Sequence, residues 1–252
     1  KHTGELYAGV SEIIKLKAKD FMAPWAALET VRYLGWEDEE RTKEVTNGKW
    51  TYQQWQNLLK EAKGSYRQKS KDAQDSGTVA HAWIEGYIKA AMNETEIPEL
   101  PKEGDEFELN GKLQPISAET TAEACNAINA FLAWVKGKNI IWHASELVVA
   151  SELHRFAGTL DALATINGRL FLVDFKSSKD CYPEYWIQLA AYRLALEEMQ
   201  IFPQDAIIIR LPKDGAKVEV YPMTMPYDLC RRTFVALREV KKWEAYVSNN
   251  DN

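Results

Sequence analysis

Three charged residues stand in a stretch of sequence that otherwise favours buried β-strands. Residues 158–179 read GTLDALATINGRLFLVDFKSSK, in which Asp161, Asp174 and Lys176 lie among apolar side chains. Unpaired charges are costly to bury, so three of them in such a segment indicate chemistry. Two carboxylates and an ammonium group could bind a divalent cation and act on a phosphate. The structural alternative is a strand-end ion pair between Asp174 and Lys176, with Asp161 in a turn.

The dipeptide Asn167-Gly168 determines how the two strands of this stretch would pair. Asn-Gly favours a two-residue hairpin, because a type I′ turn needs positive φ at both central residues. Such a turn places Asp161 directly opposite Asp174, and strand alternation brings Lys176 to the face of Asp174. Opposed carboxylates repel each other, and a Mg²⁺ or Mn²⁺ ion between them would reverse that effect. A three-residue turn with a bulge would instead separate the two acids.

Two further polar motifs flank this hairpin. His81 lies beside the apolar stripe of an expected helix, in the segment GTVAHAWIEGY. Gln188 and Tyr192 are four residues apart, so they share one face of an expected helix that Pro183 is well placed to start. Each motif has a structural alternative: a histidine satisfied in the core, and a polar patch that shields the sheet.

The chain carries an ordered set of motifs: the histidine, then Gly-x-x-Asp, Asp-x-Lys and Gln-x-x-x-Tyr. This ordered set resembles the PD-(D/E)XK nuclease superfamily. It is most similar to its RecB-like, phage-type exonuclease branch, which includes the mitochondrial genome maintenance exonuclease. The resemblance spans roughly residues 9–192, including the opening GVSEIIKLKAKDFMAPWAALETV. Branch members with a four-cysteine iron–sulfur cluster are disfavoured, because the chain has three widely spaced cysteines, Cys125, Cys181 and Cys230.

The resemblance implies a role for each motif. Asp161, Asp174 and His81 would bind Mg²⁺ or Mn²⁺ together with the main-chain carbonyl of Phe175. Lys176 would orient the attacking water or help to deprotonate it, and would balance charge in the transition state.

Other polar residues would complete the site. Gln188 and Tyr192 would support it and contact the nucleic-acid backbone. Glu146 is the additional acid we expect, at a second metal site, and Glu85 is expected to be a partner of His81. Basic residues that could contact phosphates are Lys179, Arg193, Arg231, Arg232, Arg238, Lys241 and Lys242, although a solvated helix face is an equally good interpretation of the last five.

The expected activity is Mg²⁺- or Mn²⁺-dependent hydrolysis of phosphodiester bonds in DNA. The enzyme would be an exonuclease that acts from free ends or on single strands, in recombination, repair or replication. The alternatives are an endonuclease with the same chemistry and a non-catalytic DNA-binding module. The second is disfavoured because both acids and the lysine are present. The sequence leaves cleavage polarity and oligomeric state open.

Composition agrees with a folded protein. The chain has 252 residues, of which 46% are hydrophobic, including nine tryptophans, which is ample for a buried core. A formal charge of −6 argues against a polycation that coats nucleic acid, although a local basic groove can coexist with it. We find no apolar run long enough for a membrane span and no signal peptide, so we expect an intracellular protein that is neither secreted nor membrane-bound.

The elements that must position these residues are helices first and strands second. We expect a mixed α/β fold with a restriction-endonuclease-like core, in which helices flank a mixed central sheet. The expected helices are at 23–35, 51–64, 65–92, 117–138, 183–200 and 227–247, with a charged connector, WEDEERTKE, after the first and a loop at 93–114. We expect one nuclease domain over 1–252, with a helical part at about 1–138, the core sheet at about 139–225 and a C-terminal helix at about 226–249.

Overall fold

The structure is a computed structural model that describes residues 7–17 and 22–250. These residues divide into two compact units, one that runs to Lys17 and resumes at Gly77, and one that ends at Ser76. Residues 18–21, part of the segment that resembles phage-type nucleases, lie outside the described residues. Among the described residues, no helix is both long and apolar enough to cross a membrane.

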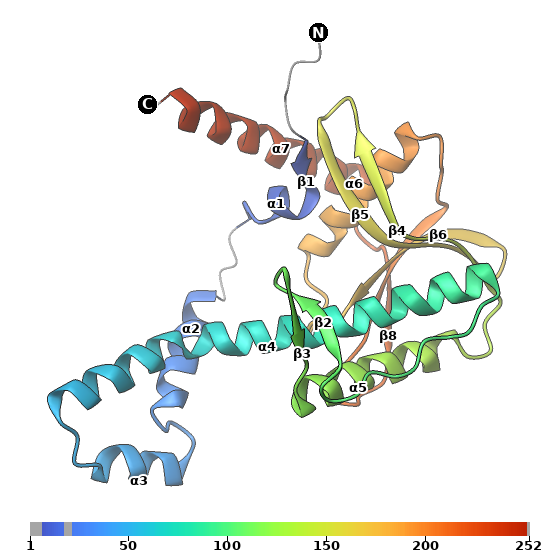
Figure 1. Cartoon of the computed structure of the whole chain (residues 1–252). Helices are drawn as coiled ribbons and strands as arrows, with labels where there is room; N and C mark the ends of the chain where they lie inside the picture. Colours follow the sequence, from blue (N-terminus) through green and yellow to red (C-terminus); the bar gives the residue numbers. More distant parts are fainter. Residues whose placement is uncertain (1–6, 18–21, 251–252) are drawn as a thin grey trace. The chain divides into compact units, whose positions relative to one another are not determined.

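A mixed β-sheet forms the centre of the first unit (Figure 1). In the order β1-β5-β6-β7-β8, β1 and β7 run parallel to their partners β5 and β6, whereas β5–β6 and β7–β8 are antiparallel. Strand β4 pairs with β5 in an antiparallel manner. The strands are β1 (Ala8–Gly9), β4 (Ile140–Ser151), β5 (Phe156–Ile166), β6 (Arg169–Lys176), β7 (Asp205–Arg210) and β8 (Glu219–Pro222).

Helices cover both faces of this sheet, which confirms the expected mixed α/β class. On one face, Val173 and Phe175 of β6 share a core with α4 and α5. On the other, Leu172 shares a core with α1, α6 and α7. The strands are therefore apolar on both faces because both faces are buried. The helices are α1 (Val10–Ile14), α4 (Tyr52–Asn93), α5 (Ala118–Val135), α6 (Glu184–Glu198) and α7 (Tyr227–Asn250).

The second unit consists of helices and differs from the sequence prediction in two places. It contains α2 (Met22–Tyr33), α3 (Glu39–Asn47) and the first part of α4. The charged segment that we expected to be a connector forms α3, because the Asp38 side chain accepts a hydrogen bond from the Arg41 N–H and caps the helix. The two helices expected around Gly64 are one helix, since a glycine weakens a helix interior without ending it.

A small hairpin lies in the segment that we expected to be a loop. Strands β2 (Glu106–Leu109) and β3 (Lys112–Pro115) pair in an antiparallel manner across Asn110-Gly111. Both turn residues have positive φ, at 56° and 74°. This Asn-Gly pair follows the same type I′ rule as the one in the larger hairpin.

The turn at Asn167-Gly168 is the two-residue turn that the sequence predicts. Its φ angles are 49° and 83°, both positive. Pairing between β5 and β6 runs from Ile166–Arg169 to Ala162–Val173 with no bulge. The predicted register is therefore confirmed up to Ala162 and Val173, one residue before the two acids.

Candidate active site

Regular pairing between β5 and β6 ends where the acidic residues begin. The last pair is Ala162–Val173, so the direct opposition of Asp161 and Asp174 that we expected is not part of the ladder. Instead, Oδ2 of Asp161 accepts the main-chain N–H of Phe175 at 2.7 Å. A side-chain carboxylate thus takes the place that a strand carbonyl would occupy in a continued ladder. The two acids remain neighbours beyond the end of the regular ladder.

Asp174 and Lys176 form a buried ion pair at this strand end. The Asp174 side chain is 1% exposed, and its Oδ2 lies 2.7 Å from Lys176 Nζ. Among the described residues, the carboxylate oxygens have no hydrogen-bond partner apart from this contact with the Lys176 ammonium group. Burial raises the pKa of Asp174 to about 6, against the opposing effect of the Lys176 charge. For Lys176, burial would lower the pKa, but the charges of Asp174 and Asp161 outweigh it and raise the pKa.

His81 approaches the acids from α4. Its Nδ1 lies 3.9 Å from Oδ2 of Asp161, and its ring packs edge-on against Phe175. Burial, and next the charge of Lys176, lower the pKa of His81 to about 4. The imidazole is therefore neutral at physiological pH and keeps a lone pair for a metal or a proton.

These side chains fit a divalent cation by their chemistry. Buried carboxylate oxygens next to a neutral imidazole are ligands that a hard cation accepts. Within residues 7–17 and 22–250, however, no group of three or more His, Cys, Asp or Glu side chains is arranged closely enough to hold a metal ion. In this arrangement the positive charge next to the carboxylates is that of Lys176.

Glu146 joins this cluster through an unusual backbone conformation. It has a φ of 49° on β4, and it lies between the pairs Ser145–Ala162 and Leu147–Leu160, next to Asp161. A non-glycine residue in this region costs about 1–3 kcal/mol, which is typical of functional sites. Burial, and then the negative charge of Asp161, raise the pKa of Glu146 to about 7. The structure thus brings Glu146 to the two acids.

Glu85 has a different partner from the one we expected. Its carboxylate forms an ion pair with Lys89, one helical turn further along α4. Its negative charge also raises the pKa of Glu146, after burial and Asp161. Glu85 therefore lies at the edge of the acidic cluster.

Gln188 and Tyr192 lie on α6 and form a hydrogen bond with each other. Nε2 of Gln188 donates to the Tyr192 hydroxyl at 3.0 Å. Burial, more than any other effect, raises the pKa of Tyr192 to about 12. The Tyr192 ring also lies against Gly158, where an added Cβ would be 2.8 Å from Cε1 of the ring and 2.9 Å from Cγ2 of Val10. The Tyr192 ring therefore leaves no room for a side chain at position 158, which links the Gly-x-x-Asp motif to the Gln-x-x-x-Tyr motif.

This contact predicts that Gly158→Ala destabilises the protein by about 1–3 kcal/mol, because the methyl group must displace Tyr192 or the strand that carries Asp161. Urea denaturation at neutral pH measures the change. Gly64→Ala is the matched control, since nothing lies within 4 Å of its Cβ position on α4. The control should be neutral or stabilising. A Gly158→Ala protein as stable as the parent would contradict this account of the motif.

Sequence reasoning missed one aromatic neighbour of the site. Lys176 Nζ lies 5.0 Å from the centroid of the Tyr185 ring, which is a cation–π distance. Tyr185 precedes Gln188 by three residues and Tyr192 by seven on α6. The helical spacing of these three polar residues was the signal that could have identified it.

The basic residues expected to contact phosphates are mostly paired within the chain. Arg193 forms an ion pair with Glu197, and Arg231 and Arg232 both pair with Asp228. Arg238 is buried and donates to the main-chain carbonyl of Arg155. Arg238 therefore does not belong to a solvated helix face, and the pairing of Arg231 and Arg232 favours a structural role for them over phosphate binding.

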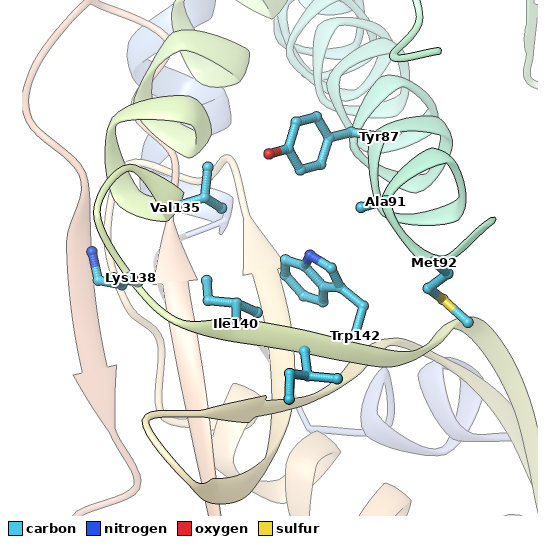
Figure 2. A pocket seen from close by; sticks show the side chains of 8 residues that line it. Tyr87, Ala91, Met92, Val135, Lys138, Ile140 and Trp142 are labelled. Carbon is cyan, nitrogen blue, oxygen red and sulfur yellow. The ribbon is translucent and has the colours of Figure 1, made fainter. Parts of the chain in front are cut away.

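A cavity of about 350 Å³ lies away from these acids, between α4, the end of α5 and the start of β4. Figure 2 shows the side chains of Tyr87 and Trp142 facing each other across it. None of the site residues predicted from the sequence lines this cavity. The charged strand end, and not the cavity, is the candidate site. The lining residues are Tyr87, Ala91, Met92, Val135, Lys138, Ile140, Ile141 and Trp142.

Comparison with known proteins gives one family match. The model of the PD-(D/E)XK nuclease superfamily matches residues 44–249. A comparison with curated proteins finds no match. Among solved structures, the crystal structure of SSO0001 is 13% identical, with a TM-score of 0.32 over 91% of this chain and 81% of that one. A protein of Eubacterium rectale, described provisionally as an exonuclease, is 15% identical, with a TM-score of 0.41 over 94% of this chain and 87% of that one. Both likenesses are too distant to carry an argument.

Proposed function

The chain belongs to the PD-(D/E)XK nuclease superfamily, and we propose that it is a Mg²⁺- or Mn²⁺-dependent deoxyribonuclease that hydrolyses phosphodiester bonds from DNA ends or on single strands. The observation that carries the proposal is the buried carboxylate of Asp174, whose oxygens have no hydrogen-bond partner among the described residues apart from the Lys176 ammonium group. Asp161 lies beside it, and Lys176 contacts it. Burying a carboxylate is costly, and a bound divalent cation would offset that cost further than Lys176 does by itself.

The proposed ligands are Asp161, Asp174 and His81, together with the main-chain carbonyl of Phe175. A cation bound there would supply a Lewis acid for the scissile phosphate and lower the pKa of its bound water. Burial keeps His81 neutral, so it can donate a lone pair. The raised pKa of Lys176 keeps it protonated, which favours charge balance and water orientation over proton abstraction as its role.

Three more residues complete the proposed site. Glu146 is the additional acid, because its carboxylate interacts with that of Asp161. Tyr192, hydrogen-bonded to Gln188, packs against the strand that carries Asp161 and so supports it. We also propose that the chain acts as one nuclease domain in DNA recombination, repair or replication, since the family match includes parts of both compact units.

The activity is tested with three labelled substrates: linear single-stranded DNA, linear duplex DNA and a closed single-stranded circle. With Mg²⁺ or Mn²⁺ we expect the linear DNA to be degraded and the circle to remain intact. Cleavage of the circle would favour the endonuclease with the same chemistry. DNA binding without cleavage in any metal, unchanged by Asp174→Ala, would favour the non-catalytic module and refute the proposed enzyme.

Metal binding should depend on pH. Mn²⁺ is expected to raise the melting temperature more at about pH 8 than at about pH 5.5, because protons compete with the metal for the carboxylates. The pKa of Asp174 is raised to about 6 and that of Glu146 to about 7, so both lose protons between these conditions. Differential scanning fluorimetry with and without EDTA measures the shift. An equal shift at both pH values would argue against these carboxylates as ligands.

A further inference from the structure

A second lysine, Lys213, lies at the same end of the sheet as Lys176. Strands β6 and β7 are parallel neighbours in which Lys176 pairs with Arg210. The N–H of Leu211 donates to the carbonyl of Lys176 at 2.8 Å, so the two segments remain hydrogen-bonded just after the end of β7. The carboxyl ends of parallel strands form the edge where open α/β sheets bind ligands. Lys213 lies three residues after Arg210, the last residue of β7.

The side chains of Lys213 and Ser177 converge on Gly77 of α4. A Cβ built on Gly77 would lie 2.6 Å from Ser177 Oγ and 3.8 Å from Lys213 Nζ. Gly77 precedes His81 by one helical turn, so both face the same side of α4. An ammonium group and a hydroxyl group are thus gathered beside the proposed metal ligand, at a position where α4 has no side chain.

The charge of Lys213 and the hydrogen bond to its main chain agree with a position beside the proposed metal ligands. The positive charge of Lys213 contributes to the lowered pKa of His81, after burial and Lys176. Burial lowers the pKa of Lys213 itself, and Glu123 on α5 opposes that effect. The main chain is held in place because the Lys213 carbonyl accepts a hydrogen bond from Nδ2 of Asn126 at 2.7 Å. Lys213 is therefore a half-buried cation on a fixed support next to the site.

We propose that Lys213 and Ser177 form a phosphate-binding subsite, which holds a phosphodiester of the nucleic acid adjacent to the one that is cleaved. The inference rests on the proposed function and adds a substrate requirement to it. An ammonium and a hydroxyl are donors for phosphate oxygens, and such contacts fix the register of a nucleic acid without reading its sequence. The substrate must then carry at least two consecutive phosphodiesters for full binding.

Binding of a labelled oligonucleotide as a function of salt tests the subsite. Measured on the Asp174→Asn background, which removes cleavage, Lys213→Gln should weaken binding and reduce the slope of log K against log salt by about 1. Lys213→Arg should retain most of the salt slope. Ser177→Ala should weaken binding but leave the salt slope unchanged. The matched control is Lys217→Gln, an exposed lysine four residues away in the same loop. The control should leave both quantities unchanged.

A second readout uses cleavage by the otherwise unchanged enzyme. The parent should cleave a trinucleotide with two phosphodiesters at a lower KM than a dinucleotide with one, and Lys213→Gln should remove that difference while kcat changes little. If Lys213→Gln lowers the melting temperature but keeps the salt slope and the length preference of the parent, the residue is structural and the inference is wrong. If the parent binds DNA without cleaving it, the proposed nuclease activity is refuted, but the salt dependence of binding still tests the phosphate-binding subsite. If it binds no DNA, both fail.

Discussion

Asp174→Asn is expected to reduce phosphodiester cleavage by about 10³-fold or more while the protein stays folded. Asparagine has nearly the shape of aspartate but no negative charge, so it removes a metal ligand and the partner of Lys176. The Asp174 side chain is buried, and burial raises its pKa to about 6. The ionised carboxylate therefore costs stability above that pH, and the neutral amide avoids this cost.

Two measurements check this prediction. Single-turnover cleavage with Mn²⁺ gives the rate, and differential scanning fluorimetry shows that the variant folds and has lost the Mn²⁺-dependent shift. Asp72→Asn is the matched control, because Asp72 is exposed on α4. It should keep both the rate and the shift. An Asp174→Asn enzyme within about tenfold of the parent rate would place the reaction elsewhere in the molecule.

Lys176→Met is expected to reduce cleavage by about 10²–10³-fold, the range for the loss of one group that stabilises charge in the transition state. Its effect on stability should depend on pH. Without the ammonium, Asp174 and Asp161 are buried acids with no cation, so their pKa values, already raised, should rise further. A buried acid with a raised pKa loses stability as pH rises from its unfolded to its folded pKa. The variant should therefore lose more stability at about pH 8 than at about pH 5.

Urea denaturation at the two pH values measures this difference. Lys179→Met is the matched control, since Lys179 is exposed three residues further along the chain. We expect it to change stability by no more than about 0.5 kcal/mol. Lys176→Arg should not restore cleavage, because a guanidinium is larger and planar. The same loss of stability at both pH values would show that Lys176 does not compensate the negative charge of Asp161 and Asp174.

Local rules account for what the sequence predicted correctly. The Asn167-Gly168 turn and the pairing up to Ala162–Val173 follow from the φ angles that the turn requires. The strand residues are apolar at consecutive positions, which predicted a sheet covered on both faces. The helix α6 and the spacing of Gln188 and Tyr192 placed these two residues on one face, where they form a hydrogen bond.

Tertiary structure decided how these parts meet. The sequence does not reveal that the ladder ends before Asp161 and Asp174, because it ends when the Asp161 carboxylate accepts the Phe175 N–H. Nor does it predict that Glu146 turns toward the acids through a positive φ. Both outcomes depend on packing and electrostatics between strands, whereas turn and helix signals act over a few residues.

The same distinction holds for contacts between distant segments. Gly158 belongs to a motif that the sequence alone identified, but its purpose appears only in the contact with Tyr192, 34 residues later. Lys213 belongs to no motif, and it lies beside Gly77 in a structure where β7 pairs with β6 and Asn126 holds the Lys213 carbonyl. The sequence by itself determined the charged residues, the turn and the class of fold. The tertiary structure decided which side chains share the strand end, because only packing brings distant segments of the chain together.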